Sequence, residues 1–236
     1  LGCSPAFDHL EVELGAGVEH GPVGWADCGL TPLDSALWRT TGHDCHMGEE
    51  HYFTADPSVP FKRAPVRALI WGDWLELTSG SGVFAHGRLD VGTGVLLGEV
   101  GPPEQATRVL DLGCGFGVIG LAIAVAVPTV QVTAVDVNER AILLANENAQ
   151  SLGVADRFRV CLPGQVDPGE SYDEIWSNPP IRVGKEALHE LLLTWLPRMK
   201  PDGQARLVVG KNLGADSLAR WLTDQGFPTT KTASSK

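Results

Sequence analysis

"VLDLGCGFGVIG", residues 109–120, runs from an apolar strand pattern through a glycine-rich turn into an apolar helix pattern. The glycines of the turn, at positions 113, 115 and 117, permit positive φ angles and a close approach of the backbone to a ligand. The helix N-terminus behind them presents unpaired N–H groups to a polar or negative group. The stretch therefore predicts a ligand-binding turn after a strand, although Gly115-x-Gly117-x-x-Gly120 also matches the dinucleotide fingerprint.

Strand and helix patterns alternate from residue 108 onward. This alternation implies a parallel sheet covered by helices on both faces, and the nearly continuous apolar strands fit burial on both sides. The prediction is an α/β fold with a doubly wound, mostly parallel sheet, in which ligands bind at the carboxyl ends of the strands. The candidate strands are 108–113, 131–137, 157–163, 172–178 and 205–211, and the candidate helices are 117–127, 138–152, 185–199 and 215–225.

A hairpin pattern precedes this alternation. Two apolar runs, "RALIW" and "WLELTSG", flank a short Gly–Asp connection and predict a β-hairpin. The following stretch, 82–100, contains a short helix pattern for which Asp90 or Thr93 is a candidate N-cap. We therefore assign residues 47–100 to an N-terminal β-hairpin and helix region, and residues 101–236 to the core.

Residues 1–46 are rich in glycine and acidic side chains and show neither helical nor strand periodicity. Met47 opens a stretch that is more typical of folded proteins, so we expect residues 1–46 to be a disordered extension or the product of a mis-set translation start. A nearby group of His and Cys suggests zinc, but its irregular spacing lacks the paired pattern of structural zinc sites. We predict no metal site from this group, which comprises His43, Cys45, His46 and His51.

The composition sets broad limits on the function. The 236 residues are 43% hydrophobic and carry a formal net charge of −11. Residues 1–46 contribute −6 of that charge, so the rest is only mildly acidic and neither demands nor excludes an RNA partner. The five cysteines lack the spacing of a disulfide framework. The longest apolar run, 118–127, is about half of the ~20 residues that a membrane span needs, and no secretory leader pattern is seen. We expect a cytoplasmic protein without membrane attachment.

Two acidic residues lie at the ends of neighbouring strand patterns. Asp111 lies inside the strand before the glycine turn, where a carboxylate costs free energy on burial unless a partner compensates it. A ligand with a cationic amino group would be such a partner, and a carboxylate that caps the turn is the alternative interpretation. Asp136 is the last polar residue of "QVTAVDV", residues 131–137. Its carboxylate can accept hydrogen bonds from both ribose hydroxyls of a nucleoside ligand.

A stiff strand end is predicted by "SNPPIRVGK", residues 177–185. Proline lacks an N–H and fixes its own φ, and it forces the residue before it away from the helical conformation. Asn178 is therefore expected to be extended, with its side-chain amide held in one direction. This arrangement suits either a loop terminator or a rigid pair of hydrogen-bond acceptors.

Together, "DLGCGFG", "VDVN" and "SNPPI", in this order and spacing, resemble class I S-adenosylmethionine-dependent methyltransferases of the methyltransferase small domain group. With the earlier "GVFAHGRLDVGTGVLL", they are similar to the guanine-N2 methyltransferases of small-subunit ribosomal RNA. The resemblance covers roughly residues 51–236. It implies a Rossmann-like fold, S-adenosyl-L-methionine as cofactor, and ribosomal RNA or the small ribosomal subunit as partner, with no metal and no membrane.

The resemblance also implies roles for individual residues. Asp136 would take the ribose hydroxyls and Val137 would lie near the adenine. The methionine part of the cofactor would be surrounded by Asp111, Gly113, Cys114, Gly115 and Gly117, with Asn178 at its border. The catalytic tetrapeptide would be Asn178, Pro179, Pro180 and Ile181. In this family the Asn oxygen and the carbonyl of the following Pro accept both N–H bonds of a planar amine. Such contacts position a poorly nucleophilic nitrogen without a strong base.

The chain departs from the family pattern in three ways. Ile181 stands where many relatives carry an aromatic residue that stacks on the target base. Residues 162–165 lack the acidic residue that often binds the adenine amino group. The better-known members have two copies of the domain, whereas one is seen here, and the sequence stops at "KTASSK", where relatives continue into another strand. We therefore expect the sheet to lack an edge strand.

The favoured hypothesis is an S-adenosylmethionine-dependent N-methyltransferase for an exocyclic amine of an RNA base, guanine N2 of 16S ribosomal RNA. A protein glutamine-N methyltransferase uses a similar tetrapeptide with a tyrosine after the prolines, so Ile181 disfavours it. A nicotinamide-dependent oxidoreductase is disfavoured by Asp111 and by the proline-rich strand end. A catalytically silent module that binds cofactor or RNA stays open because of Ile181 and the short C-terminus.

Overall fold

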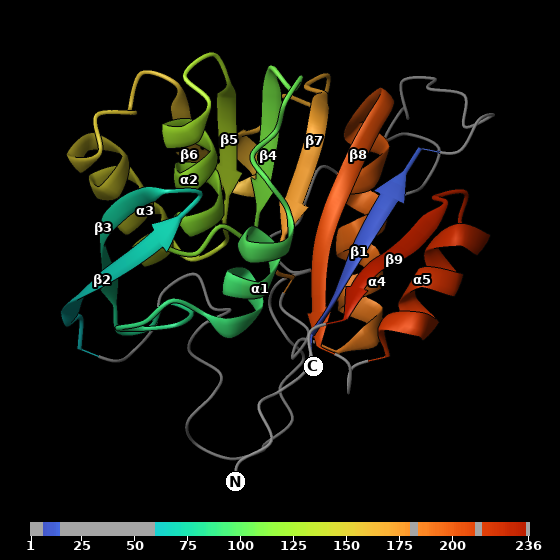
Figure 1. The fold of residues 1–236 in the computed structure, drawn as a ribbon, viewed down its shortest axis with the longest axis horizontal. Coiled ribbons are helices and arrows are strands. Elements are labelled where there is room, and N and C mark those ends of the chain that lie inside the picture. Colours follow the sequence, from blue (N-terminus) through green and yellow to red (C-terminus); the bar gives the residue numbers. More distant parts are fainter. Residues whose placement is uncertain (1–6, 15–59, 180–183, 211–213, 235–236) are drawn as a thin grey trace, which may run out of the picture.

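The structure is a computed structural model, and it describes residues 7–14, 60–179, 184–210 and 214–234. A seven-stranded sheet forms its centre, and a two-stranded sheet lies beside it (Figure 1). From one edge to the other, the large sheet consists of β6 (Phe158–Cys161), β5 (Gln131–Val135), β4 (Arg108–Leu112), β7 (Tyr172–Ser177), β8 (Met199–Gly210), β1 (Phe7–Glu13) and β9 (Thr229–Ser234). The first five of these strands are parallel to one another, and β1 is antiparallel to both β8 and β9.

Helices cover both faces of the large sheet (Figure 1). One buried cluster contains side chains of α1 (Val91–Glu99), α2 (Val118–Ala126) and α3 (Glu139–Ser151). A second cluster, on the other face, contains side chains of α4 (Lys185–Trp195) and α5 (Ala215–Asp224). The predicted doubly wound, mostly parallel α/β fold is therefore confirmed. Within the described ranges, no helix is long and apolar enough to cross a membrane.

The local sequence explains where the helices begin. In α1, Asp90 is the N-cap and its carboxylate accepts a hydrogen bond from the Thr93 N–H at 3.0 Å. In α3, Asn138 is the N-cap and accepts from the Arg140 N–H at 2.9 Å. These side chains satisfy backbone donors that have no partner within the helix. Of the two candidate caps for the helix within 82–100, the structure uses Asp90.

The predicted hairpin is present as β2 (Arg63–Ile70) and β3 (Asp73–Gly80), which pair in antiparallel fashion. One face of the hairpin packs on the core through Val66, Leu75 and Leu77. Asn148 of α3 fastens it further, because its side chain accepts from the Thr78 N–H at 2.8 Å and donates to the Thr78 carbonyl at 3.0 Å. The hairpin and the loop that follows it are thereby fixed against the sheet.

Residues 7–13 correct the prediction for the segment 1–46. The sequence predicts an extension or a mis-set start, whereas these residues form β1, between β8 and β9. Leu10 and Val12 alternate with His9 and Glu11, as in a half-buried strand, but this pattern is short and stands in a segment otherwise rich in glycine and acidic residues. Its pairing and the ion pair between Glu11 and Arg206 of β8 fix its position.

The strand at this edge of the large sheet is β9, and β1 lies between β8 and β9. The sequence analysis, by contrast, predicts that the sheet lacks an edge strand. Residues 1–6 and 15–46 lie outside the described residues, as do His43, Cys45, His46 and His51, for which the sequence predicts no metal site.

Candidate functional site

The carboxyl ends of β4, β5 and β7 lie at the same end of the large sheet, at the lower side of the molecule in Figure 1. Ligands of open α/β sheets bind at the carboxyl ends of the strands. The glycine loop follows β4, Asp136 follows β5, and Asn178 follows β7. The sequence prediction thus places these residues on three neighbouring strands, and the structure puts them at one edge.

The glycine loop needs its glycines. The φ angles of Gly113, Gly115 and Gly117 are +73°, +54° and +94°, which is the left-handed region that other residues adopt at a cost. A Cβ at Gly117 would come within 2.9 Å of Leu121, whereas a Cβ at Gly115 would meet nothing within 4 Å. The backbone at Gly115 therefore faces open space, as a loop that approaches a ligand requires.

Asp111 is fully buried, and its two oxygens differ. Oδ2 accepts a hydrogen bond from the Gly120 N–H at 2.8 Å, in the first turn of α2. Oδ1 has no hydrogen-bond partner in the part of the chain that the structure describes. Burial raises the pKa of Asp111 to about 7, against the lowering effect of the Gly120 hydrogen bond. The capping interpretation thus accounts for Oδ2, whereas Oδ1 is a buried acceptor without a partner among the described residues.

Asp136 holds the glycine loop and the start of α3 together. Its Oδ2 accepts from the Gly115 N–H at 2.8 Å, and its Oδ1 accepts from the Asn138 N–H at 2.9 Å. Burial raises the pKa of Asp136, although these hydrogen bonds act in the opposite direction. A carboxylate oxygen can accept more than one hydrogen bond, so both oxygens retain capacity for the hydroxyls of a ribose.

The two remaining residues predicted near the cofactor differ in exposure. Val137 is half-buried and follows Asp136 directly. Cys114 is buried, and burial raises the pKa of its thiol well above the usual value, so the thiol stays neutral. A small side chain that packs inside the loop accounts for Cys114.

Asn178 is oriented by two side chains: Asp90, the N-cap of α1, and Thr93, in the first turn of α1. Its Nδ2 donates to Asp90 Oδ2 at 2.6 Å and to Thr93 Oγ1 at 3.1 Å. A carboxylate only accepts hydrogen bonds, so the NH2 of the amide must face Asp90. The Oδ1 of Asn178 is therefore the acceptor on the other branch of the amide, in a residue that lines the same cleft as the glycine loop.

Asn178 lies in a small cleft of about 30 Å³, whose walls come from three parts of the chain. It is lined by Phe84, Ala85, Asp90, Thr93, Gly113, Cys114, Gly115, Phe116, Val118, Ile119 and Asn178. Pro179 is buried directly behind Asn178. Pro180 and Ile181, the other members of the predicted tetrapeptide, lie outside the described residues.

Sequence reasoning missed the contribution of the loop before α1. It considered Asp90 only as a helix cap, and it assigned no role to Phe84. The contact between Asp90 and Asn178 joins residues 88 positions apart, so only the fold reveals it. The signal was present in "GVFAHGRLDVGTGVLL", which the resemblance singled out as a unit.

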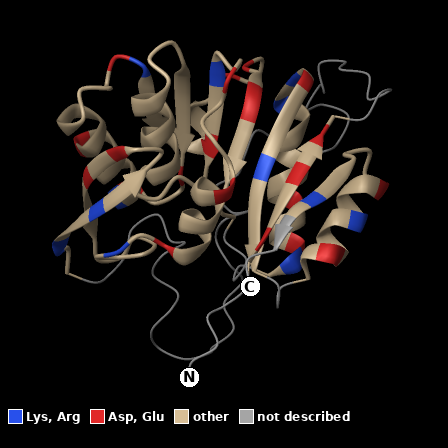
Figure 2. Ribbon diagram, in the orientation of Figure 1, with Lys and Arg blue, Asp and Glu red and all other residues tan. Residues whose placement is uncertain are grey.

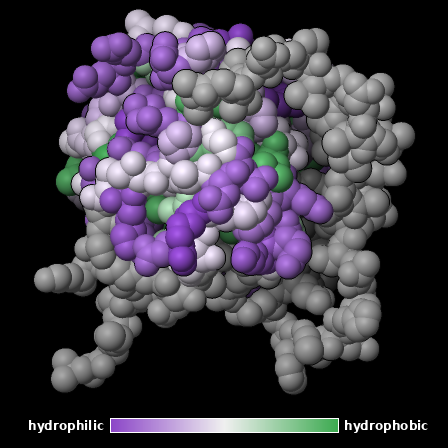
Figure 3. Space-filling view, turned by 90° about the vertical axis from the view of Figure 1, so that its right-hand side faces the viewer, coloured by the Kyte–Doolittle hydropathy of each residue, from purple (hydrophilic) through white to green (hydrophobic). Residues whose placement is uncertain are grey.

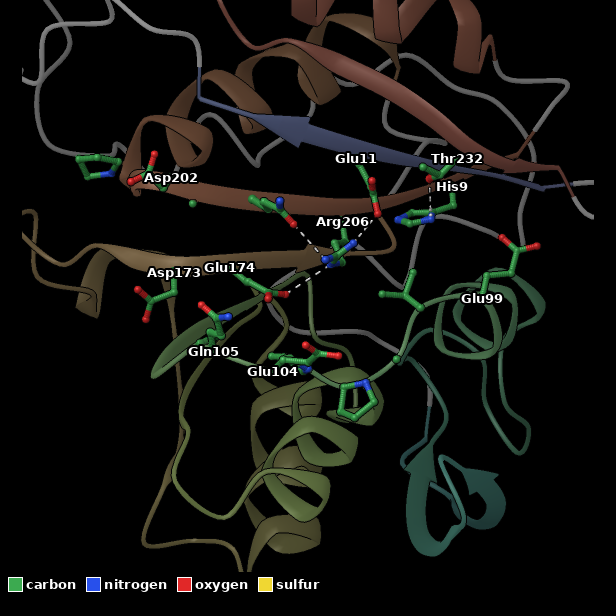
Figure 4. Close-up of a pocket in the computed structure, with 18 residues that line it drawn as sticks. His9, Glu11, Glu99, Glu104, Gln105, Asp173, Glu174, Asp202, Arg206 and Thr232 are labelled. Atoms are coloured by element: carbon green, nitrogen blue, oxygen red, sulfur yellow. Dashed lines mark hydrogen bonds and ion pairs between the residues drawn. The ribbon is translucent and has the colours of Figure 1, made fainter.

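A second hollow lies away from this site. It is a polar groove of about 750 Å³ beside the amino ends of β4 and β7, shown with its lining residues in Figure 4. Arg206 lies in it and pairs with Glu11 and Glu174. None of the predicted site residues lines this groove. It lies at the edge where open α/β sheets do not bind their ligands, so its size does not make it the active site.

Among the residues that the structure places, no three His, Cys, Asp or Glu side chains gather in a way that could hold an ion.

The Rossmann-like sheet, the glycine loop, the acidic residue after β5 and the proline-backed Asn after β7 define the class I methyltransferases. The chain belongs to the methyltransferase small domain family, whose family model matches residues 74–234. S-adenosyl-L-methionine is the cofactor of this family, as the sequence analysis expected.

Two relatives and one solved structure illustrate the similarity. The chain is 34% identical to the uncharacterized protein YbxB of Bacillus subtilis over 177 residues, which are 74% of this chain and 88% of that protein. It is 31% identical to ribosomal RNA small subunit methyltransferase C of Pasteurella multocida, over 76% of this chain and 53% of that one. The chain thus spans about half of this second relative.

The solved structure is the Thermus thermophilus 16S rRNA N2 G1207 methyltransferase in complex with AdoMet and guanosine. It has a TM-score of 0.55 and 22% sequence identity, over 64% of this chain and 43% of that chain. At this identity the match shows the fold.

Proposed function

We propose that this protein is a cytoplasmic S-adenosyl-L-methionine-dependent N-methyltransferase that modifies guanine N2 of 16S ribosomal RNA. The observation that carries the proposal is the amide of Asn178, whose NH2 is held by Asp90 and Thr93 and whose oxygen has no hydrogen bond to any described residue. The relative from P. multocida and the T. thermophilus structure, which are small-subunit ribosomal RNA methyltransferases, support the choice of substrate.

The cofactor would be held by residues at the carboxyl ends of two strands, β4 and β5. Asp111 would face its ammonium group with the oxygen that lacks a partner, Asp136 would accept from the ribose hydroxyls, and Val137 would contact the adenine. The glycine loop allows close approach at Gly115. S-adenosyl-L-methionine supplies an electrophilic methyl carbon on a sulfonium when it is bound.

Asn178 and Pro179 would position the amine that receives the methyl group. The exocyclic nitrogen of guanine is a poor nucleophile because its lone pair is delocalised into the ring. Asn178 Oδ1 and the Pro179 carbonyl would accept its two N–H bonds and aim the lone pair at the methyl carbon. Pro180 would stiffen this strand end, and Ile181 would provide apolar contact with the base. Positioning of this kind lowers the barrier without a strong base.

The substrate partner would be ribosomal RNA or the small ribosomal subunit. Figure 2 shows that Lys and Arg residues are interspersed with Asp and Glu residues along the described helices and strands. In this view the described elements carry no run of basic residues like the basic stripe of many nucleic-acid binders. We therefore expect recognition to depend on base contacts at the site and on a structured RNA or subunit more than on phosphate contacts.

Methyl transfer from tritium-labelled S-adenosyl-L-methionine tests the proposal. The acceptors are 30S and 50S subunits and their naked RNAs, isolated from a strain that lacks the gene, followed by mass spectrometry of the nucleosides. We expect label in N2-methylguanosine of 16S RNA. Label in another nucleoside or in 23S RNA would contradict the guanine-N2 or small-subunit assignment. Label in a release factor with none in RNA would favour the glutamine-N methyltransferase.

Replacement of Asp90 by Ala is expected to lower the rate of methyl transfer by about 10-fold, the equivalent of one lost hydrogen bond of about 1.4 kcal/mol. Without the carboxylate, the amide of Asn178 can turn and present NH2 to the substrate instead of its oxygen. Single-turnover kinetics measures the rate, and calorimetry with S-adenosylhomocysteine should show an unchanged Kd.

Two variants separate this role from the helix cap that Asp90 also provides. Asp90→Ser keeps a capping side chain but is too short to hold the amide of Asn178, so it should be as slow as Asp90→Ala. Asp90→Asn keeps both a cap and an acceptor, so it should recover most of the rate. An active Asp90→Ser variant would show that Asp90 acts only as a cap.

A further inference from the structure

Phe84 is an exposed aromatic residue in the cleft that contains Asn178. Its side chain is 42% exposed, and it lines the cleft together with Asn178 and Asp90. For comparison, the described residues on the side of the molecule formed by α5 and β9 are mostly hydrophilic (Figure 3). An aromatic ring that stays exposed beside hydrogen-bond acceptors is typical of a surface on which a planar ligand stacks.

The loop that carries Phe84 is fixed on both sides. The Gly82 carbonyl accepts from Asn138 Nδ2 at 2.6 Å, and the Gly87 N–H donates to Ser79 Oγ at 2.8 Å. Next to Phe84, Ala85 has a φ of +59°. A residue with a Cβ pays about 1 kcal/mol or more for this left-handed conformation. The strain and the hydrogen bonds together hold the backbone around Phe84 in one conformation.

The same hydrogen bonds connect this loop to the cofactor side of the site. Asn138, which holds Gly82, donates its backbone N–H to Asp136 Oδ1. Asp136 in turn holds the glycine loop through Gly115. The loop that carries Phe84 is thereby placed relative to the glycine loop by three consecutive hydrogen bonds.

We propose that Phe84 is the stacking platform for the target base, a purine in an unpaired stretch of RNA. The proposal rests on the proposed function and adds a specificity residue to it. The ring of Phe84 would lie against one face of the base, while Asn178 and Pro179 address the exocyclic amine at its edge. Many relatives have an aromatic stacking residue after the two prolines, whereas this sequence has Ile181 there, so the aromatic contact comes from Phe84. RNA bases that are unstacked from their neighbours are commonly bound in this way.

Replacement of Phe84 by Ala should lower kcat/KM for RNA by about 5- to 150-fold, because stacking of one base on an aromatic ring is worth about 1–3 kcal/mol. Phe84→Tyr and Phe84→Trp keep a ring and should stay within about threefold of wild type, whereas Phe84→Leu should resemble Phe84→Ala. The Kd for S-adenosylhomocysteine and the midpoint of urea unfolding should not change, since the side chain is half-exposed.

Trp74→Ala is the matched control. Trp74 is an aromatic residue of similar exposure, 55%, on β3 and outside the lining of the cleft, so its loss should leave kcat/KM within about twofold. Full activity of Phe84→Ala or of Phe84→Leu would overturn the stacking role. An equal loss in Trp74→Ala, or a lost affinity for S-adenosylhomocysteine in Phe84→Ala, would overturn it as well. If the wild-type protein methylates no RNA, the proposed function fails. If it does and Phe84→Ala is as active, only this inference fails.

Discussion

Replacement of Asn178 by Ala is expected to lower the single-turnover rate of methyl transfer by about 10²- to 10³-fold, the usual loss when one fixed hydrogen-bonding group of a transition state is removed. The variant loses the oxygen that Asp90 holds in place for the substrate amine. Cofactor binding should persist, because Asp111, Asp136 and the glycine loop are unaffected. Calorimetry with S-adenosylhomocysteine should give a Kd within about twofold of wild type, as expected for a group that acts on the transition state and not on cofactor binding.

Ser177→Ala is the control for this prediction. Ser177 precedes Asn178 on the same strand, is fully buried, and donates its hydroxyl to the Leu112 carbonyl at 2.7 Å. Its replacement costs about 1 kcal/mol of stability without touching the amide of Asn178, so the rate should be nearly that of wild type. A wild-type rate in Asn178→Ala would remove the acceptor role. A loss of the same size in Ser177→Ala would assign the effect to general disturbance of the strand end.

Replacement of Asp111 by Asn is expected to change both stability and cofactor affinity. The pKa of Asp111 is raised from 3.8 to about 7 in the folded protein by burial. The folded state therefore binds more protons than the unfolded state between these values, so stability falls as the pH rises through this window. Between pH 5 and pH 8 the wild-type protein should lose about 3 kcal/mol through this group. Asp111→Asn should lack this loss.

Urea unfolding of the cofactor-free protein at pH 5 and pH 8 measures the difference between the two proteins, which removes the effect of other titrating groups. Calorimetry at pH 8 should show that Asp111→Asn binds S-adenosylhomocysteine about 10- to 100-fold more weakly, since a charge-assisted hydrogen bond to the ammonium is worth about 1.5–3 kcal/mol. Equal pH dependence of the two proteins would show that Asp111 stays ionised in the folded state. Equal affinity would show that its free oxygen does not face the ligand.

The core of the fold could be predicted because its signals are local. The strand 108–113, the turn after it and the helix 117–127 all depend on neighbours in sequence, and the structure reproduces them as β4, the glycine loop and α2. The β8 strand is an informative exception. The prediction starts at 205, whereas the strand starts at Met199, because Pro201, Asp202 and Gly203 hide its first part.

The site could be predicted only in part, for a related reason. Asp111, Asp136 and Asn178 stand at strand ends, where the alternation of elements places them without further information. Asp90 and Phe84 belong to a loop whose position depends on hydrogen bonds to Asn138, Ser79 and Asn178. Such tertiary contacts leave no period in the sequence. The β1 strand does carry a short alternation of apolar and polar residues, but its partners lie more than 190 positions away along the chain, so the sequence did not show that it joins the sheet.

The position of β1 also determines the order in which the protein can fold. Asp8 faces Val209 on one side and Ser234 on the other, so the strand leaves the ribosome long before either neighbour exists. Closing so long a loop is entropically costly and makes such pairings slow. Until it docks, β8 and β9 expose unpaired backbone groups along a slot, where an extended segment of another chain could insert. We therefore expect the nascent protein to need shielding from its neighbours until the last strand has emerged.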